Sequence, residues 1–250
     1  KIENDCAGLQ SDIQDNQSKT SIPTTSVKEA STSPYLEQVA RIKQYIYDGD
    51  IFQANLSRPW HVEIEPSVTD VDIFKYLSAS NPGSFAALIK MNAVTVISSS
   101  PERLVRSKNK CVETRPIAGT RPRSSENKAD AALAKELLAH PKEQAEHIML
   151  IDLERNDLGR VCIPGSMKVN ELMTLESYQH VHHIVSNIQG EIREEVTPVD
   201  IIRAVFPGGT ITGCPKVRCM EILSEMEKES RGAYTGSVGY INRDGSLDFN

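Results

Sequence analysis

Tyr178-Gln-His-Val-His-His-Ile-Val-Ser-Asn-Ile-Gln-Gly-Glu-Ile192 alternates with a period of two, which predicts a long β-strand. Val181, His183 and Val185 are expected to share one face of that strand. His182 then points to the opposite face, so one of the two adjacent histidines faces the interior and the other faces water. A lone histidine in a strand is more often structural than catalytic, and on this pattern alone both interpretations of His183 stand.

Helical and hairpin patterns surround this strand on both sides. The expected elements are a helix ending at Gly49, a strand over Ile51–Ile64, a hairpin of Phe85–Lys90 and Ala93–Ser99, helices over Ala129–His140 and Pro141–Leu153, a helix from Thr197-Pro198 to Val205, a helix from Gly213-Cys-Pro215 to about Lys228, and a hairpin of Tyr234–Ile241 and Ser246–Phe249. Because hairpins are grouped with helices and strict βαβ alternation is missing, the pattern predicts an α+β fold with antiparallel sheets.

The composition suits one large domain or two small ones. The 250 residues carry a formal net charge of −6, which argues against general binding to nucleic acid or to a membrane surface. No apolar run reaches the roughly 18 residues of a membrane-spanning helix, and no signal peptide is recognisable. The 5 cysteines are odd in number and lack CxxC spacing. They favour reduced, structural thiols in a cytoplasmic protein over a disulfide framework or a zinc site.

The two ends of the chain differ in character. Residues 1–33 are rich in Ser, Thr, Asp and Asn and contain few large apolar side chains. They bury too little surface to offset the entropy of ordering, so a polar linker or disordered segment is expected there, followed by a folded domain over residues 34–250. Because the chain begins with Lys1 and stops at Asn250 inside an expected strand, we expect a fragment of a longer protein.

Glu143 and Glu146 stand three residues apart, just before the apolar pair Ile148 and Met149. On a helix, residues at this spacing share a face. Paired carboxylates on one face suit Mg²⁺, which takes oxygen ligands and keeps waters for its substrate. A solvated helix face is the alternative interpretation.

Glu102 follows Ser100-Pro101 at the end of an expected strand, where a side chain can project into a cleft. A partly desolvated glutamate has a raised pKa and can act as a general acid. An exposed turn glutamate would have no such role, and this motif alone leaves both possibilities open.

Two glycine-containing loops offer amides, hydroxyls and cations to an anion. In Thr114-Arg-Pro-Ile-Ala-Gly-Thr-Arg-Pro-Arg123, Gly119 allows close approach of the backbone, Thr120 offers a hydroxyl, and the arginines can pair with carboxylates. Phe206-Pro-Gly-Gly-Thr-Ile-Thr-Gly-Cys-Pro-Lys216 opens a helix whose N-terminal amides favour anions, and it lacks the GK[ST] of a P-loop. This favours a carboxylate over a nucleotide triphosphate. A basic surface loop and a structural turn are the alternatives.

From about Tyr35 to Asn250, these motifs in this order resemble the chorismate-utilising enzymes. That family includes anthranilate synthase component I, aminodeoxychorismate synthase component I, isochorismate synthase and salicylate synthase. The resemblance implies an α+β sandwich of antiparallel sheets flanked by helices, with chorismate as substrate and Mg²⁺ as cofactor. It also implies that further glutamates of the metal site and a substrate-binding arginine lie beyond Asn250, so the chain as given is expected to be poorly active.

The resemblance assigns roles to individual residues. Glu143 and Glu146 look like the first half of the Mg²⁺ site, and Glu102 looks like the carboxylate that protonates the leaving C4 hydroxyl. His183 resembles the active-site histidine of the family. The positions similar to substrate-contacting ones are Gly119, Thr120, Thr210, Gly213 and Tyr234. A degenerate, non-enzymatic homologue that binds a small acid is the rival class, and intact carboxylates and His183 count against it.

Gln53 separates two branches of the family. Isochorismate and salicylate synthases carry a lysine at the matching place as the base that activates water, and glutamine cannot act as that base. The resemblance therefore implies a member that uses ammonia. No Cys-His glutaminase signature is present. We therefore expect the ammonia to come from a glutamine amidotransferase subunit as partner.

Two ammonia-using branches remain. Asn55, the stretch His180–Ser186 and the stretch Pro207–Gly213 resemble aminodeoxychorismate synthase component I, which serves 4-aminobenzoate and folate biosynthesis. Ala118 instead resembles anthranilate synthase component I of tryptophan biosynthesis, because many aminodeoxychorismate synthases have at that place a lysine thought to attack C2. The expected reaction is amination of chorismate to 4-amino-4-deoxychorismate, and formation of anthranilate with release of pyruvate is the alternative.

Overall fold

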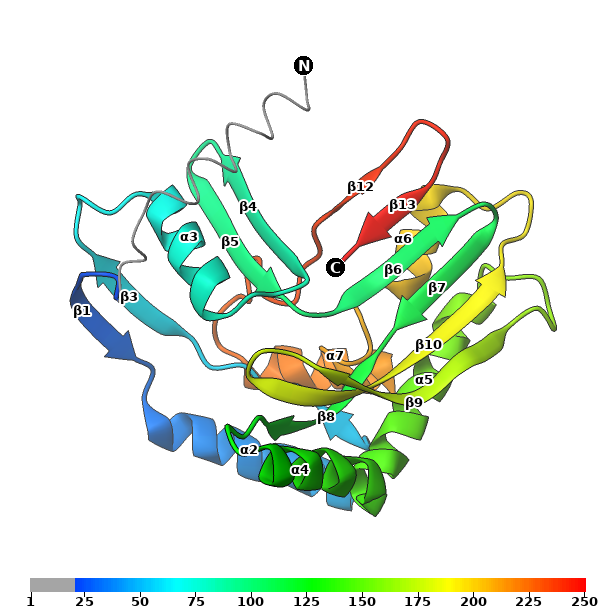
Figure 1. The fold of residues 1–250 in the computed structure, drawn as a ribbon, viewed down its shortest axis with the longest axis horizontal. Coiled ribbons are helices and arrows are strands. Elements are labelled where there is room, and N and C mark those ends of the chain that lie inside the picture. The colour runs from blue at the N-terminus through cyan, green and yellow to red at the C-terminus, as the bar shows by residue number, and fades with distance from the viewer. Residues whose placement is uncertain (1–20) are drawn as a thin grey trace.

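The computed structural model describes residues 21–250 (Figure 1). In chain order the elements are β1 (Thr24–Glu29), α2 (Thr32–Tyr47), β2 (Gln53–Ala54), β3 (Trp60–Ile64), α3 (Asp70–Ser80), β4 (Phe85–Met91), β5 (Val94–Ser100), β6 (Arg103–Lys108), β7 (Cys111–Arg115), β8 (Ile117–Pro122), α4 (Asn127–Ala139), α5 (Pro141–Gly159), β9 (Lys168–Ser177), β10 (Val181–Glu191), α6 (Pro198–Val205), β11 (Gly213–Cys214), α7 (Lys216–Met226), β12 (Gly239–Ile241) and β13 (Leu247–Phe249). A 7-stranded sheet has the order β12-β13-β6-β7-β10-β8, with β9 also paired to β10. Its strands pair antiparallel, so the expected α+β class with antiparallel sheets is confirmed.

β10 connects three strands of this sheet. One part of it, Ile188–Glu191, pairs with β7, and an earlier part, Val181–Val185, pairs with β8. β9 pairs with β10 as well. Only Pro116 separates β7 from β8, so these two strands follow each other beside β10. The long strand predicted from the alternating pattern is therefore the strand on which this part of the sheet is assembled.

The pairing of β8 with β10 contains a bulge at Gly119. His183 lies opposite Thr120, but the next residue, Ile184, lies opposite Ala118, so Gly119 is an extra residue in the ladder. Gly119 has a φ of +76°, in the left-handed region that glycine adopts without steric cost. A Cβ atom there would also lie 3.1 Å from a leucine side chain of α4. Glycine therefore permits both the bulge and the close packing of the helix.

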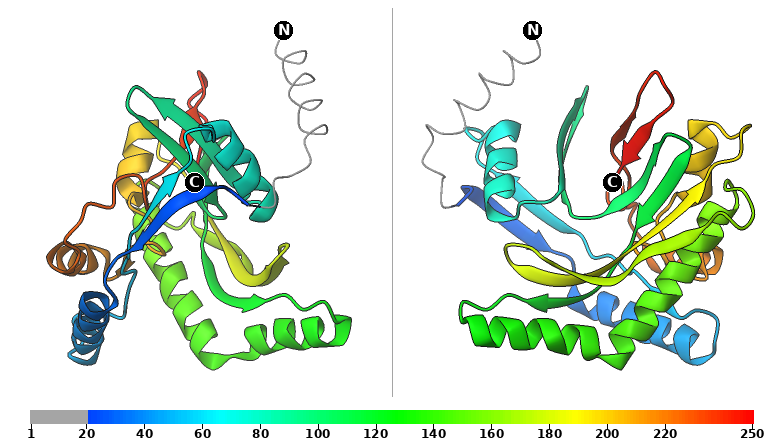
Figure 2. Two further views of the ribbon diagram at one scale, coloured as in Figure 1. Left: turned by 90° about the vertical axis from the view of Figure 1, so that its left-hand side faces the viewer. Right: turned by 45° about the vertical axis from the view of Figure 1, so that its right-hand side comes forward.

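The main core lies between the large sheet and helices α5 and α6. Side chains from β6, β7, β10 and β13 pack against the buried faces of the two helices. Figure 2 shows α5 running beside the sheet and α4 set at an angle to α5, alongside β8. The buried members are Val105, Val112, Ile151, Leu158, Val161, Cys162, Ile188, Ile201, Ala204, Val205 and Leu247. A smaller core joins α2 and α7 around Ile42, Ile51, Cys219, Ile222 and Leu223.

Several elements begin and end close to the positions that local signals predict. α6 starts after Thr197, whose hydroxyl accepts from the Asp200 N–H while the Asp200 carboxylate accepts from the Thr197 N–H. Pro198 occupies the first helical position, as expected. The expected hairpin of β4 and β5 is present, but its turn lies one residue later than expected, because Met91 pairs with Val94. α5 continues past its expected end to Gly159.

Three expectations differ from the structure. Ile51–Ile64 is not one strand: β2 pairs with β11 and β3 pairs with β1, and residues 55–59 connect them. Strand structure in the last hairpin starts at Gly239, because residues 232–235 form turns. β1 lies inside the segment predicted to be a linker and pairs with β3, so the prediction is wrong for residues 24–29. α2 also begins inside that segment, at Thr32, and residues 1–20 lie outside the described residues.

No helix within residues 21–250 is long and apolar enough to cross a membrane. Cys111, Cys162, Cys214 and Cys219 are free thiols, as expected, while Cys6 lies outside the described part of the chain. Cys219 is buried and Cys214 is partly buried.

The substitution Gly119→Ala is expected to destabilise the fold by more than the substitution Gly165→Ala. Both glycines have positive φ, so alanine should cost roughly 1–3 kcal/mol at either position. A Cβ at Gly165 meets nothing within 4 Å, whereas a Cβ at Gly119 would lie 3.1 Å from both Leu137 and Glu143. Urea unfolding followed by circular dichroism measures the two losses. Equal losses would contradict the close packing of α4 and α5 on the bulge.

Candidate active site

Glu102 connects two parts of the chain that are far apart in sequence. It lies between β5 and β6, where its Oε1 accepts a hydrogen bond from the Ile117 N–H of β8 at 2.9 Å. Its Oε2 accepts one from the hydroxyl of Thr210, in the glycine-rich loop, at 3.0 Å. Burial raises the pKa of Glu102 to about 7, although both hydrogen bonds favour the carboxylate and oppose that rise. Near neutral pH both protonation states are populated, which suits a group that donates a proton in a reaction.

Thr120 and His183 lie opposite each other in the β8–β10 ladder. Thr120 Oγ1 is 3.0 Å from His183 Nδ1, and the carbonyl oxygen of Gly119 is 3.4 Å from the same nitrogen. The Tyr178 ring packs edge-on against the imidazole, with the ring centroids 5.8 Å apart. Burial lowers the pKa of His183 below its ordinary value. At neutral pH the imidazole is therefore mainly uncharged and serves as a hydrogen-bonding group.

Glu143 lies directly beside the bulge in β8. A Cβ atom on Gly119 would lie 3.1 Å from Glu143 Oε2, and Arg121 Nη1 is 3.2 Å from Glu143 Oε1. Glu146 follows one turn later on α5, and both glutamates are partly buried. The bulge thus brings the first of the two predicted metal ligands next to Gly119 and, through it, to the Thr120–His183 pair.

The side chains of α5 can offer Mg²⁺ two protein ligands. Glu143 and Glu146 supply carboxylate oxygens, and one or two carboxylates are common for Mg²⁺, which keeps waters and binds oxygen atoms of its substrate. Within residues 21–250, no three His, Cys, Asp or Glu side chains converge as a metal site. The two carboxylates fit the oxygen preference of Mg²⁺. A cation bound there would compete with Arg121 for Glu143.

The glycine-rich loop between α6 and α7 is held by β2 and the residue after it. Gly213 pairs with β2, and a Cβ there would lie 2.2 Å from the carbonyl oxygen of Gln53. Asn55 donates from Nδ2 to the carbonyl oxygen of Ile211 at 2.9 Å. Only glycine fits at position 213 without displacing the chain. These contacts hold the loop in the position from which Thr210 reaches Glu102.

Gln53, in β2, and Tyr234, which contacts Asn55, lie next to the contacts that hold the glycine-rich loop. The Gln53 Oε1 atom is buried and has no hydrogen-bond partner among the residues that the structure describes. The Tyr234 hydroxyl accepts a 3.4 Å hydrogen bond from Asn55 Nδ2, and the Arg231 guanidinium lies over the Tyr234 ring. Asn55 therefore links Tyr234 to the glycine-rich loop.

The residues singled out from the sequence form two groups with Glu102 between them. One group lies where β8, β10 and α5 meet and consists of Gly119, Thr120, Glu143 and His183, with Glu146 one helical turn from Glu143. The other lies around the glycine-rich loop and consists of Gln53, Thr210, Gly213 and Tyr234. Glu102 contacts the first group's strand through Ile117 and the second group through Thr210.

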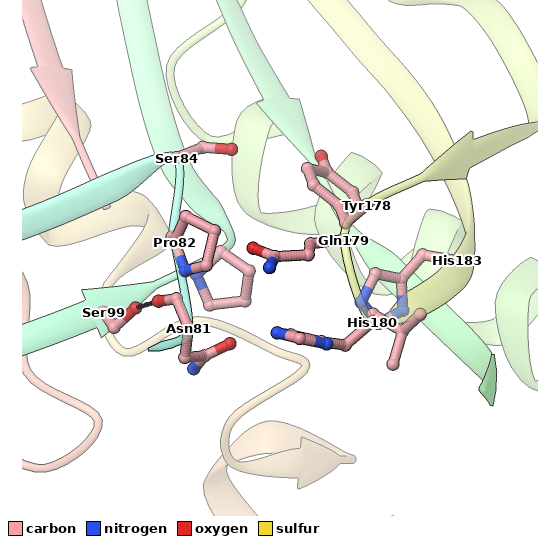
Figure 3. A pocket seen from close by; sticks show the side chains of 11 residues that line it. Asn81, Pro82, Ser84, Ser99, Tyr178, Gln179, His180 and His183 are labelled. Atoms are coloured by element: carbon pink, nitrogen blue, oxygen red, sulfur yellow. Dashed lines mark hydrogen bonds between the residues drawn. The ribbon is translucent and has the colours of Figure 1, made fainter. Parts of the chain in front are cut away.

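A pocket opens beside His183 (Figure 3). The turn at residues 178–181 faces residues 81–84, which precede β4, across this pocket. The Ser99 hydroxyl donates a hydrogen bond to the Asn81 carbonyl oxygen within its wall. Neither Glu102 nor Glu143 lines it. The pocket therefore borders the Thr120–His183 pair and is not centred on the acid.

Glu154, on the buried face of α5, was not among the site residues predicted from the sequence. It is only 5% exposed, and burial, followed by the nearby charge of Asp157, raises its pKa to about 8. A signal was present in the sequence, because Leu150, Glu154 and Leu158 repeat at four-residue spacing and so place a carboxylate at a core position. Asp157, one turn further on, is paired with Lys216 at the start of α7.

The arrangement of an acid between β8 and a glycine-rich loop, beside two helix carboxylates, agrees with the resemblance noted from the motifs. The chain belongs to the family of chorismate binding enzymes, whose family model matches residues 1–250. It is 53% identical over 216 residues to aminodeoxychorismate synthase component 1 of Bacillus subtilis, covering 86% of this chain and 46% of that protein. It is 46% identical over 233 residues to anthranilate synthase component 1 of Acetivibrio thermocellus, covering 93% and 46%.

A solved structure shows the same fold. The crystal structure of anthranilate synthase component I from Streptococcus pneumoniae TIGR4 matches with a TM-score of 0.82 at 31% identity, covering 99% of this chain and 55% of that one. This chain therefore spans about half the length of the relatives that it matches.

The substitution Glu154→Gln is expected to make stability less dependent on pH. The folded-state pKa of Glu154 is raised above its ordinary value of 4.5, so its contribution to stability is fully present below that pH and is lost as the pH rises through about 8. Each pKa unit corresponds to about 1.4 kcal/mol. Glutamine stays neutral and removes this loss.

Chemical denaturation near pH 5 and near pH 8 measures the effect. Asp152→Asn, on the exposed side of the same helix, is the matched control and should keep the pH dependence of the parent. An unchanged pH dependence in Glu154→Gln would contradict the raised pKa of Glu154.

Proposed function

We propose that the protein to which this chain belongs aminates chorismate to 4-amino-4-deoxychorismate, the precursor of 4-aminobenzoate in folate biosynthesis. The observation that carries the proposal is Glu102, a partly buried acid with a pKa of about 7 that is held between β8 and the glycine-rich loop. Similarity to the Bacillus subtilis aminodeoxychorismate synthase component 1 supports this choice of product. The words "component 1" in that name point to a second component, which in this proposal is a glutamine amidotransferase that supplies ammonia.

Glu102 supplies the proton for the hydroxyl that leaves C4 of chorismate. Its O–H bond breaks, a new O–H bond forms on the C4 hydroxyl, and the electron pair of the C4–O bond departs with water. The carboxylate that remains on Glu102 accepts hydrogen bonds from the Ile117 N–H and the Thr210 hydroxyl, which stabilise its charge. A nucleophile adds at C2 as the hydroxyl leaves, and ammonia then adds at C4 as that nucleophile departs. Pyruvate is not lost in this reaction.

The remaining residues of the site bind and orient the substrate. In this proposal Gly119 and Gly213 contact the substrate through their backbones, while neighbouring protein atoms fill the Cβ positions of both residues. Thr120 holds the uncharged imidazole of His183, so this pair offers hydrogen bonds to the substrate. The exposed Tyr234 offers a hydroxyl from the opposite side of the glycine-rich loop.

Glu143 and Glu146 would hold Mg²⁺ in this proposal. When bound, the cation supplies positive charge to a substrate carboxylate and eases loss of the hydroxyl by stabilising developing charge. Arg121 pairs with Glu143 in this structure, and the bound cation would compete with it for that carboxylate.

Gln53 supports ammonia over water as the incoming nucleophile. A glutamine amide has no basic nitrogen with which to activate water. The buried and unpartnered Oε1 atom of Gln53 is a hydrogen-bond acceptor to which an N–H donor such as ammonia could bind.

Anthranilate synthesis is the second candidate. Ala118, in place of a lysine, favours it, and the side chain of Ala118 is buried beside β10, where it provides no nucleophile. Similarity to anthranilate synthases of Acetivibrio thermocellus and Streptococcus pneumoniae supports it as well. If the product is 4-amino-4-deoxychorismate, ammonia or another external nucleophile has to add at C2.

The product formed by the full-length enzyme distinguishes the two candidates. With chorismate, Mg²⁺ and excess ammonium, we expect no anthranilate fluorescence and no pyruvate. Addition of aminodeoxychorismate lyase should then yield 4-aminobenzoate. Fluorescence with pyruvate release before the lyase is added would contradict the proposed product and establish anthranilate synthesis.

The substitution Glu143→Gln is expected to abolish the stabilisation by Mg²⁺ together with chorismate. A ligand that binds only the folded state raises the melting temperature, by an amount that reflects about 2.7 kcal/mol at a hundredfold excess over its Kd. The parent and the control Asp152→Asn should both show the rise, measured by thermal denaturation of the full-length protein. A rise caused by chorismate that requires neither the metal nor Glu143 would favour a binding protein without this catalytic site.

A further inference from the structure

Arg231 forms a largely enclosed ion pair behind the glycine-rich loop, and the reaction described above assigns it no role. Its side chain is 17% exposed, and that of its partner Glu227, directly after α7, is 10% exposed. Arg231 Nε donates to Glu227 Oε2 and Nη2 donates to Oε1, both at 2.6 Å. Desolvation offsets much of the attraction within such a pair, so its net contribution to stability is small. What the pair provides is a guanidinium that is fixed in place and in direction.

The other N–H groups of this guanidinium bind the backbone of two segments that are distant in the chain. Nη1 donates to the carbonyl oxygen of Ile211, in the glycine-rich loop, at 3.2 Å, and Nη2 donates to the carbonyl oxygen of Asn55, just after β2. Nη1 also donates to the Thr235 hydroxyl at 3.4 Å. The five N–H donors of a guanidinium are therefore all in use.

Further hydrogen bonds join the same segments around the ion pair. The Ile211 carbonyl oxygen also accepts from Asn55 Nδ2 at 2.9 Å. Glu227 Oε1 accepts from the N–H and the hydroxyl of Ser57, at 2.8 Å and 2.9 Å. The segment after β2 is thus bound both to the loop and to the partner of Arg231. Removal of the guanidinium would leave the loop carbonyl with the Asn55 amide alone.

The carbonyl that Arg231 holds is adjacent to a group that contacts the acid. Thr210 precedes Ile211, and its hydroxyl donates to Glu102 Oε2 at 3.0 Å. Because the two loop residues share a peptide bond, a shift of the Ile211 carbonyl also shifts the Thr210 side chain. The position of the hydroxyl on Glu102 therefore depends on contacts made on the other side of the loop.

We propose that Arg231 is a positioning residue that holds the Ile211 carbonyl and thereby keeps the Thr210 hydroxyl on Glu102 during proton transfer. This inference deepens the proposed function and rests on it, because it requires that Glu102 donates a proton and that Thr210 stabilises the carboxylate that remains. Arg231 acts through the loop and contacts neither the substrate nor Glu102.

Lysine cannot replace Arg231 in this role. A lysine ammonium keeps the positive charge beside Glu227 and Tyr234, but it lacks the planar fork that reaches two carbonyl oxygens while it binds a carboxylate. The substitution Arg231→Lys therefore loosens the loop and retains the charge. It should lower kcat and leave KM for chorismate nearly unchanged.

The test is a double-mutant cycle of Arg231→Lys and Thr210→Val in the full-length enzyme, with chorismate, Mg²⁺ and excess ammonium. We expect Arg231→Lys to lower kcat about tenfold and to change KM by less than about twofold, since a misplacement of about 1 Å can cost up to about a hundredfold in rate. Valine at position 210 removes the hydroxyl and keeps the branched shape. In that background Arg231→Lys should lower kcat by less than about twofold, because the group that it positions is absent.

Arg218→Lys is the matched control, because Arg218 forms exposed ion pairs with Asp50 and Glu221 and does not contact the loop. It should leave kcat and KM unchanged. An equal fall in kcat in both backgrounds, or a rise in KM without a fall in kcat, would overturn the proposal, because a general structural role does not depend on the Thr210 hydroxyl. If Arg231→Lys fails to fold, Glu227→Gln, which keeps an acceptor for the guanidinium, takes its place in the cycle with the same expectation.

Hydrogen exchange without substrate separates this inference from the proposed function. Deuterium uptake by residues 206–215 of the full-length protein should be faster in Arg231→Lys than in the parent and in Arg218→Lys. Unchanged uptake would overturn the inference. If the enzyme consumed no chorismate, the proposed function would fail, and the exchange rates would still decide whether Arg231 holds the loop.

Discussion

β8 pairs with β10 around the bulge at Gly119, and the positions of the other site residues depend on this pairing. The register places Thr120 opposite His183 and leaves the extra residue, Gly119, next to Glu143 of α5. The same strand presents the Ile117 N–H to Glu102. A shift of β8 by one residue would move each of these groups to the other face of the sheet, because side chains alternate along a strand.

Burial then determines the chemistry of the acids in this frame. Glu154 is buried and Glu102 is partly buried. The glycine-rich loop packs against Glu154 at Gly209 and donates a hydrogen bond to Glu102 from Thr210. Desolvation penalises the ionised form of each acid, so the pKa of Glu102 lies at about 7 and that of Glu154 at about 8 rather than near 4.5. Asp157, in contrast, forms an ion pair with Lys216, so the charges of the two side chains compensate each other. One helix, α5, thus provides a neutral acid and a salt bridge one turn apart.

Local signals in the sequence predicted the elements that depend on local interactions. The capping pair of Thr197 and Asp200 specifies where α6 begins, and alternation specifies β10. β6 to β9 and α3 were not predicted from the sequence, although β6 pairs with the next strand, β7, and β9 pairs with the next strand, β10. In the site, glycine and carboxylate motifs indicated Gly119, Thr120 and Glu143. The contact between Glu154 and the glycine-rich loop joins segments that are distant in the chain, so only the structure shows it.

The structure of the full-length Glu102→Gln variant with Mg²⁺ and chorismate tests the central claim most directly, because this variant should bind substrate without protonating it. The account predicts the cation on Glu143 and Glu146 and the C4 hydroxyl of chorismate within hydrogen-bonding distance of residue 102. Chorismate bound in the pocket between residues 81–84 and 178–181, with its C4 hydroxyl remote from residue 102, would contradict the account.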